Sequence, residues 1–171
     1  MVLAHSISSE LEILCIQRIS YRPIRVNSKT TWALVEVETT DGISGVGEAT
    51  YFRGSHQFPD IVSAANDRLI GSPLSSAFQI DLFSDESGLA EWAVMSAIEH
   101  ACWDISGKLS DLPVHALLGS TANYHIPLYA NVNRRTLERS PKGFERSIQD
   151  ARRDGFSKFK IAPFDNVSPE S

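Results

Sequence analysis

Lys160 and two asparagines, Asn131 and Asn133, stand near the ends of two otherwise apolar segments. The segments are residues 126–133 (IPLYANVN) and 156–162 (FSKFKIA), and both patterns are typical of β-strands. Side chains alternate between the two faces of a strand, so one face of each segment is apolar and the three polar residues lie on the other. We expect the apolar faces to pack under helices; they comprise Ile126, Leu128, Ala130 and Val132, and then Phe159 and Ile161.

These polar residues break the rule that a parallel strand flanked by helices is apolar on both faces. A buried lysine is costly unless it is paired, and pairing or desolvation is what turns a lysine into an acid–base or electrostatic group. We therefore expect Lys160 to be catalytic and Asn131 and Asn133 to bind substrate. The alternative is structural: the asparagines cap the strand end and Lys160 extends its stem to reach solvent.

The segment between the two strands predicts the element that positions them. Ser140 and Pro141 have the residue types of a helix N-cap and first helical position, and Gly155 is a typical stop. Strand, helix and strand at this spacing form a βαβ unit with parallel pairing. We interpret it as the start of a β/α (TIM-type) barrel, in which the carboxyl ends of the strands hold the chemistry.

The first part of the chain predicts a separate α+β domain. Residues 11–19, 31–38 and 43–49 have strand patterns with short connections, which indicates a three-stranded antiparallel meander. Positive charges and Pro23 predict an exposed loop at 21–29. Helices are expected at 59–70, 73–83, 86–109 and 113–118, the third marked by apolar residues at steps of three and four. We expect a boundary near 119–125, giving domains 1–122 and 123–171.

Composition limits the class of partner. The 171 residues are 42% hydrophobic and 22% charged with a net charge of −5, and no basic stripe suggests nucleic acid. Apolar runs are far shorter than the ~20 residues of a membrane span, and the N-terminus lacks a secretory pattern. Cys15 and Cys102 fall inside predicted elements, so we expect structural thiols in a reducing cytoplasm.

Several segments carry a family resemblance. Residues 97–108 (AIEHACWDISGK) and 112–119 (LPVHALLG) resemble the last helix of the capping domain in mandelate racemases and muconate-lactonizing enzymes, a branch of the enolase superfamily. Gly45-Val-Gly-Glu48 resembles the Gly-x-Gly-Glu that ends the third strand of that domain, and residues 126–131 and 155–161 resemble the first two barrel strands. The resemblance covers nearly the whole chain from about Leu11.

The resemblance implies an α+β capping domain followed by a barrel, and a Mg²⁺-dependent removal of the proton α to a carboxylate. In such enzymes the metal stabilises an enediolate, and the outcome is racemisation, cycloisomerisation or dehydration, often of acid sugars. It also implies that the chain forms homo-oligomers and that two capping-domain loops recognise the substrate. The matching candidates for binding its carboxylate or hydroxyls are Tyr21, Arg22, Arg25, Arg53 and His56, although each could equally be a solvated loop residue.

Two departures from the family pattern qualify these expectations. Members commonly have Lys-x-Lys at the end of the second barrel strand; aligned on Gly155-Phe156, Lys160 takes the first place and Ala162 the second, while a shifted register uses Lys158 and Lys160. The first register favours dehydration over racemisation. The chain also supplies only two barrel strands, so the metal-binding carboxylates of the third to fifth strands are expected beyond residue 171.

We therefore expect no metal ligands in this chain, with Asp41, Glu48, Glu99 and Asp104 in ordinary structural roles, and no cofactor or turnover for the chain alone. Mg²⁺ and a small carboxylate or acid-sugar substrate are expected of a full-length relative. Two alternatives stay open. One is a non-catalytic, cap-like association module, and the other is the remnant of a disrupted gene.

Overall fold

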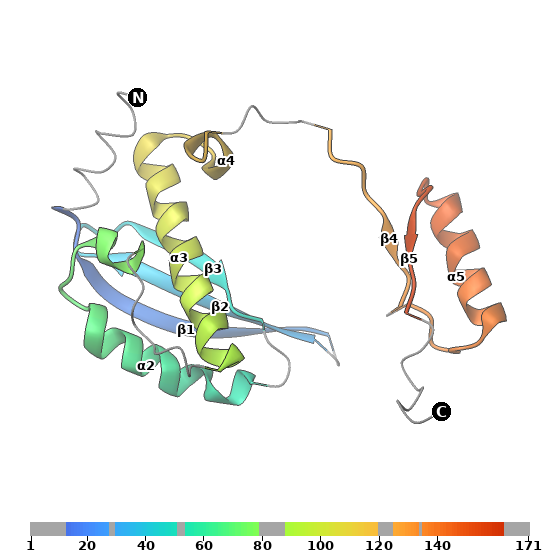
Figure 1. Cartoon of the computed structure of the whole chain (residues 1–171), viewed down its shortest axis with the longest axis horizontal. Coiled ribbons are helices and arrows are strands. Elements are labelled where there is room, and N and C mark those ends of the chain that lie inside the picture. The colour runs from blue at the N-terminus through green and yellow to red at the C-terminus, as the bar shows by residue number, and fades with distance from the viewer. Residues whose placement is uncertain are drawn as a thin grey trace. The chain divides into compact units, whose positions relative to one another are not determined.

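The computed structural model describes residues 13–27, 30–50, 54–78, 88–119, 125–133 and 135–162. The chain divides into two compact units, Met1–Ala122 and Asn123–Ser171, and each is described here by itself (Figure 1). No helix within the described ranges combines the length and the apolar character needed to cross a membrane.

The first unit contains the predicted antiparallel meander. Its strands are β1 (Ile16–Asn27), β2 (Thr30–Thr39) and β3 (Ser44–Glu48), hydrogen-bonded in the order β1-β2-β3. Alternate residues of β2 are buried, as its alternating sequence predicts. Gly42 has φ of +79° in the turn between β2 and β3, a conformation that glycine adopts without strain.

The predicted loop at residues 21–29 is wrong for the described part of that range. Tyr21 to Asn27 continue β1, which pairs with β2 as far as Asn27 opposite Thr30. Pro23 is tolerated because β1 is an edge strand. Its partner Ala33 donates its N–H to Thr50 Oγ1 and accepts at its carbonyl from the Ala49 N–H, so both groups point away from β1. Position 23 therefore needs no N–H donor toward β2, and proline, which lacks one, fits there.

Two helices cover one face of this sheet (Figure 1). They are α2 (Phe58–Leu69), preceded by the short 3₁₀ helix η1 (Ser55–Gln57), and α3 (Leu89–Ser110), followed by α4 (Val114–Leu117). The expected helix at 73–83 is a 3₁₀ turn, η2 (Leu74–Phe78), where the structure describes it; residues 79–83 lie outside the described ranges. The core between sheet and helices is apolar and includes Ile16, Val35, Val37, Phe58 and Ile98, all fully buried.

The glycines of Gly45-Val-Gly-Glu48 let α3 pack directly on β3. A Cβ built on Gly45 would lie 2.1 Å from the carbonyl oxygen of Ala101, and one on Gly47 would lie 1.9 Å from that of Ala97. Any side chain at these positions would therefore push the helix off the strand. On the same contact, Asp104 accepts a hydrogen bond from the Val46 N–H and pairs with Lys108, as the i,i+4 spacing predicts.

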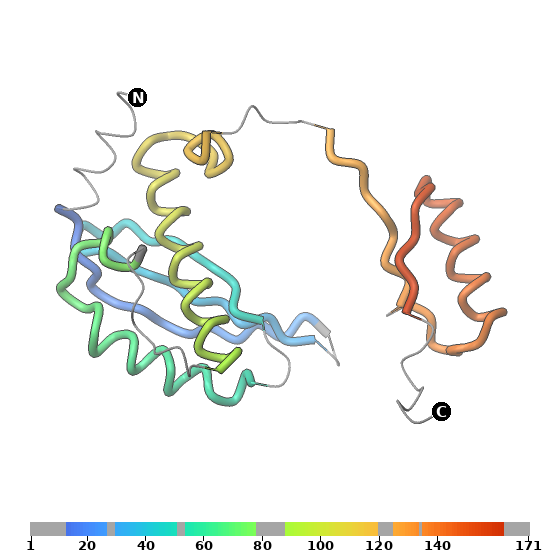
Figure 2. Tube along the Cα trace, in the orientation of Figure 1, coloured from blue at the N-terminus to red at the C-terminus, as the bar shows by residue number. Residues whose placement is uncertain are grey.

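The second unit is a βαβ unit, as expected. Figure 2 follows the chain from β4 (Ala130–Asn131) through α5 (Pro141–Arg153) to β5 (Phe159–Lys160), which pairs with β4 in parallel. The Ser140 side chain accepts from the Gly143 N–H, which confirms the predicted N-cap. Ala130, Val132 and Phe159 pack against Phe144 and Ala151 of the helix.

Both strands of this unit are shorter than predicted. Residues 125–129 are not in a strand, and Ile126 and Leu128 are 76% and 70% exposed rather than packed under a helix. The only described partner strand, β5, forms a two-residue ladder with β4, and that ladder ends before it reaches these residues. Ile161, expected on the apolar face, is also largely exposed, at 46%.

Candidate functional site

The parallel ladder brings Asn131 and Lys160 together. The register pairs Asn131 directly with Lys160, one residue after the pair Ala130 and Phe159. Ala130 and Phe159 pack toward α5, so alternation turns Asn131 and Lys160 to the opposite face. Two of the predicted site residues are therefore neighbours on the helix-free face of the sheet, at the ends of their strands.

Asn133 links the two strands just beyond the ladder. Its Oδ1 accepts a hydrogen bond from the Ala162 N–H, and its Nδ2 donates to Asn131 Oδ1 at 2.7 Å and to the Lys160 carbonyl at 3.5 Å. Asn131 Oδ1 also accepts from the Asn133 N–H at 3.3 Å. The structure thus joins all three predicted residues, with Asn133 in the role of the bridge between strands.

Arg139 completes this arrangement and is absent from the set of residues predicted from the sequence. It donates to the carbonyls of Asn133, at 3.0 Å, and Ala162, and so holds the carboxyl ends of both strands. Its guanidinium lies 5.1 Å from the centre of the Phe144 ring, over its face. The sequence carries one signal for Arg139, its place in the connection between the first strand and the helix. Such connections run past the carboxyl ends of the strands, where a site is expected.

The rest of the connection after β4 is tied to α5. The Thr136 hydroxyl is buried; it donates to the Val132 carbonyl and is hydrogen-bonded to the Ser147 hydroxyl at 2.8 Å. Gly143 allows the backbone of Glu138 to approach, since a Cβ there would lie 1.9 Å from the Glu138 carbonyl oxygen. These contacts fix the segment that carries Asn133 and Arg139.

Lys160 differs from the expectation of a buried lysine. It is exposed, and within the described ranges it forms no ion pair. Asn131 is exposed as well, whereas Asn133 is half-buried. Two strands leave the side of the sheet opposite α5 open, and this is why the lysine needs no buried partner here.

A hollow of about 570 Å³ lies on the other side of the sheet. It is lined by Phe144, Ile148 and Ile161, with Arg139 and Arg152 among its polar neighbours. Asn131 and Lys160 do not line it. The candidate residues Asn131 and Lys160 and this hollow are therefore on different faces of the unit.

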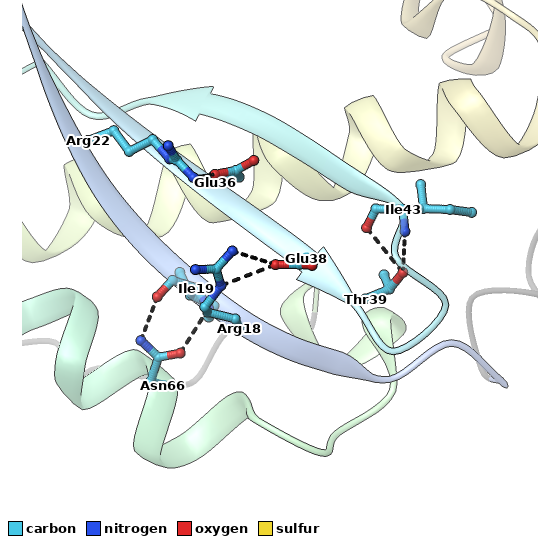
Figure 3. A network of polar contacts seen from close by, with 8 residues as sticks. All are labelled: Arg18, Ile19, Arg22, Glu36, Glu38, Thr39, Ile43 and Asn66. Carbon is cyan, nitrogen blue, oxygen red and sulfur yellow. Dashed lines mark hydrogen bonds and ion pairs between the residues drawn. The ribbon is translucent and has the colours of Figure 1, made fainter.

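The candidates in the first unit have structural contacts. Tyr21 packs edge-on against Phe58 with ring centres 5.9 Å apart, and burial raises the pKa of its phenol. Arg22 pairs with Glu36 across β1 and β2 at 2.6 Å (Figure 3). Arg25 is exposed opposite Thr31, and His56 is exposed in η1. Arg53 lies outside the described residues. The described contacts do not bring these candidates into one cluster.

The described residues do not fit a metal ion. No three of the His, Cys, Asp and Glu side chains within the described ranges lie close enough together to hold one. Glu48 accepts from the Thr50 hydroxyl, Glu99 accepts from Trp103 Nε1, and Asp104 pairs as described above. These contacts lie within the first unit and leave the three carboxylates engaged with protein groups.

Comparison with known proteins identifies the family. Residues 11–119 match the family described as "Mandelate racemase / muconate lactonizing enzyme, N-terminal domain". A D-mannonate dehydratase from Caulobacter vibrioides is 32% identical over 113 residues, which are 61% of this chain and 27% of that protein. A cis-3-hydroxy-L-proline dehydratase from Roseibium aggregatum is 25% identical over 135 residues, 75% of this chain and 35% of that protein.

Solved structures show the same fold. An enolase from Agrobacterium radiobacter, crystallised with Na and L-malate bound, superimposes with a TM-score of 0.68 at 26% identity; the match covers 87% of this chain and 38% of that one. The chain spans between a quarter and two fifths of the length of the relatives named here. It has the fold of an enolase-superfamily capping domain followed by part of a barrel, and it belongs to the mandelate racemase / muconate lactonizing enzyme family.

Proposed function

We propose that this chain supplies the capping domain and the first two barrel strands of an acid-sugar dehydratase. In this proposal Lys160 acts at the reacting carboxylate and Asn131 binds one of its oxygens. The observation that carries the proposal is the register of the parallel ladder, which puts Asn131 and Lys160 side by side on the face opposite α5. An ammonium and a carboxamide on neighbouring residues of the same face can both donate to an oxygen that carries negative charge.

Proton removal next to a carboxylate builds negative charge on the carboxylate oxygens. Donors that are already oriented toward that charge stabilise it without reorganising. Lys160 would contribute a positive charge and Asn131 a neutral donor. Mg²⁺, which enolase-superfamily enzymes generally use to stabilise the same charge, has no fitting ligand cluster among the described residues and is proposed only for a protein that includes the rest of the barrel.

The relatives support a dehydratase and a carboxylate substrate. The names of the two curated relatives include D-mannonate and cis-3-hydroxy-L-proline, and the Agrobacterium structure holds L-malate. All three molecules carry a carboxylate and a hydroxyl group. The shared chemistry is a small hydroxy acid, and the position of Ala162 in place of a second lysine also favours dehydration over racemisation.

A titration of the purified chain tests the binding part of this proposal. L-malate and D-mannonate are added to isotopically labelled protein, and the resonances of Asn131 and Lys160 are followed by NMR. We expect saturable shifts at millimolar acid that are absent with the neutral alcohol mannitol and lost in Lys160→Met. Equal responses to mannitol, or an unchanged response of Lys160→Met, would contradict the proposed site.

Two measurements test the enzymatic part. We expect the 171-residue chain alone to form no 2-keto-3-deoxy product from D-mannonate with Mg²⁺, and detectable Mg²⁺-dependent product would refute this. Sequencing the coding DNA past codon 171 is expected to reveal further barrel strands with spaced Asp and Glu residues. Without such strands, the dehydratase proposal applies to ancestry only.

A non-catalytic association module is the second candidate, and one observation favours it. Ile24, Val26 and Trp32 are 44%, 44% and 46% exposed on the β1–β2 hairpin, where Ile24 pairs directly with Trp32. Clustered exposed apolar side chains are typical of contact surfaces between proteins.

A further inference from the structure

Both donor hydrogens of the Asn133 side chain are directed to groups of the protein. A carboxamide has one oxygen that accepts and one NH₂ group with two hydrogens. The oxygen accepts from Ala162, and the two hydrogens are directed to Asn131 Oδ1 and to the Lys160 carbonyl. Asn133 therefore has no donor left for a substrate, contrary to the role expected from the sequence.

The same contacts determine which end of the Asn131 carboxamide faces outward. Its oxygen accepts from two groups of Asn133, the main-chain N–H and Nδ2. The main-chain N–H is always a donor, so rotating the Asn131 amide by 180° would set donors against donors. The network thus holds Oδ1 inward and leaves the NH₂ group of Asn131 to point away from Asn133.

We infer that Asn133 is a positioning residue that makes the Asn131–Lys160 pair a donor-only subsite for an anionic oxygen. Both exposed groups are donors, since an ammonium has no acceptor and the Asn131 acceptor is occupied. The subsite favours a carboxylate and rejects ligands that present an ammonium or another donor without an acceptor at this point. This inference rests on the proposed function, because it assigns the polarity of the same site.

Arg139 keeps the bridge in place. Its guanidinium donates to the Asn133 carbonyl and to the Ala162 carbonyl, the two residues whose amide and side chain form the inter-strand bond. The strand ends are therefore joined twice, once by Asn133 and once by Arg139. Second contacts of this kind hold binding groups in the orientation that a ligand requires.

Ligand-free NMR tests the positioning role. We expect slow hydrogen exchange for the Ala162 amide and two well-separated, protected Asn133 NH₂ signals in the wild-type chain. Asn133→Ala should increase the Ala162 exchange rate at least tenfold and shift the Asn131 NH₂ signals, while Lys142→Ala, on the exposed side of α5, changes neither. Rapid exchange of Ala162 in the wild type, or unmoved Asn131 signals in Asn133→Ala, would overturn the positioning role.

Asn131→Asp separates donor polarity from structure. An aspartate oxygen still accepts from both groups of Asn133, so the protection of Ala162 should persist. Asn131→Asp loses the outward donors, so its affinity for L-malate should fall at least tenfold. The affinity of Asn133→Ala should fall about fivefold or more, and that of Lys142→Ala should not change. Unchanged L-malate affinity in Asn131→Asp would refute the donor-only subsite and the proposed role of Asn131, while leaving the proposed role of Lys160 intact.

The two proposals fail in distinguishable ways. If the wild-type chain shows the predicted amide protection but gives no response to L-malate, the carboxylate site of the proposed function is wrong and the subsite falls with it, whereas Asn133 remains a bridge between strands. If L-malate binds and Ala162 is unprotected, the acid site stands and the positioning role is wrong.

Discussion

The Asn66 side chain forms a pair of hydrogen bonds with the backbone of Ile19, in which Oδ1 accepts from the N–H at 2.8 Å and Nδ2 donates to the carbonyl at 2.7 Å (Figure 3). β1 is an edge strand, and at Ile19 the peptide groups on the free edge are satisfied by a side chain from α2 instead of a neighbouring strand. The contact fastens the helix to the sheet and blocks that part of the edge from pairing with another chain.

Asn66→Ala is expected to destabilise the first unit by about 1–3 kcal/mol, because it leaves buried backbone groups without partners. Urea unfolding followed by tryptophan fluorescence measures this directly, since all three tryptophans, Trp32, Trp92 and Trp103, belong to this unit. Asp67→Ala is the matched control, exposed on the same helix, and should change stability by less than about 0.5 kcal/mol. Equal effects of the two substitutions would show that the Ile19 contact contributes little.

Gly47→Ala should destabilise the same unit by about 1–3 kcal/mol or more, since the new methyl group would lie 1.9 Å from the Ala97 carbonyl oxygen and α3 must move. The control Val46→Ala changes an exposed side chain one residue away and should cost about 1 kcal/mol or less. The urea midpoints of both variants are compared with the wild type. A Gly47→Ala midpoint at the wild-type value would mean that α3 does not pack on β3 as closely as described.

Ionisation of the Cys102 thiol makes the free energy of unfolding depend on pH in the alkaline range. Burial in α3, together with the charge of Glu99, raises the pKa of its thiol from 9 to about 12. The folded-state pKa is raised, so below pH 9 the thiol is neutral in both states and has no effect on stability. Above pH 9 the unfolded chain loses this proton and the folded chain keeps it, so stability is lost as the pH rises toward 12.

The comparison of wild type with Cys102→Ala isolates this effect from other groups that titrate at high pH. We expect the difference in unfolding free energy between the two proteins to change by about 1.4 kcal/mol per pH unit between pH 9.5 and 11, with the wild type losing more. Below pH 8.5 the difference should be constant. A constant difference over the whole range would mean that the thiol ionises as readily in the folded chain as in the unfolded one.

The exposed hairpin predicts self-association. Trp32→Ser should lower the average mass measured by light scattering, since it removes the largest apolar side chain of the pair Ile24 and Trp32. Leu137→Ser is the control, because Leu137 is 84% exposed and belongs to the other unit. A wild-type chain that is already monomeric, with a single cooperative melting transition, would argue against the association module.

Local patterns were sufficient for several parts of this fold. Three of them are the alternation in β2, the three-and-four spacing in α3 and the cap at Ser140. Each depends on residues only a few positions apart, and the structure confirms all three. The prediction at 21–29 was wrong for the opposite reason. Charges and Pro23 indicate a loop when the sequence is considered alone, but an edge strand paired on one side only can hold both.

The sequence by itself determined that Asn131 and Lys160 share the face of their sheet opposite the apolar residues, because alternation along a strand is a property of the backbone. Tertiary structure alone decided how those residues are connected. The register that pairs Asn131 with Lys160, the bridging role of Asn133 and the clamp by Arg139 depend on contacts between residues 6 to 29 positions apart. Such contacts follow from how two strands are aligned, and no local pattern specifies that alignment.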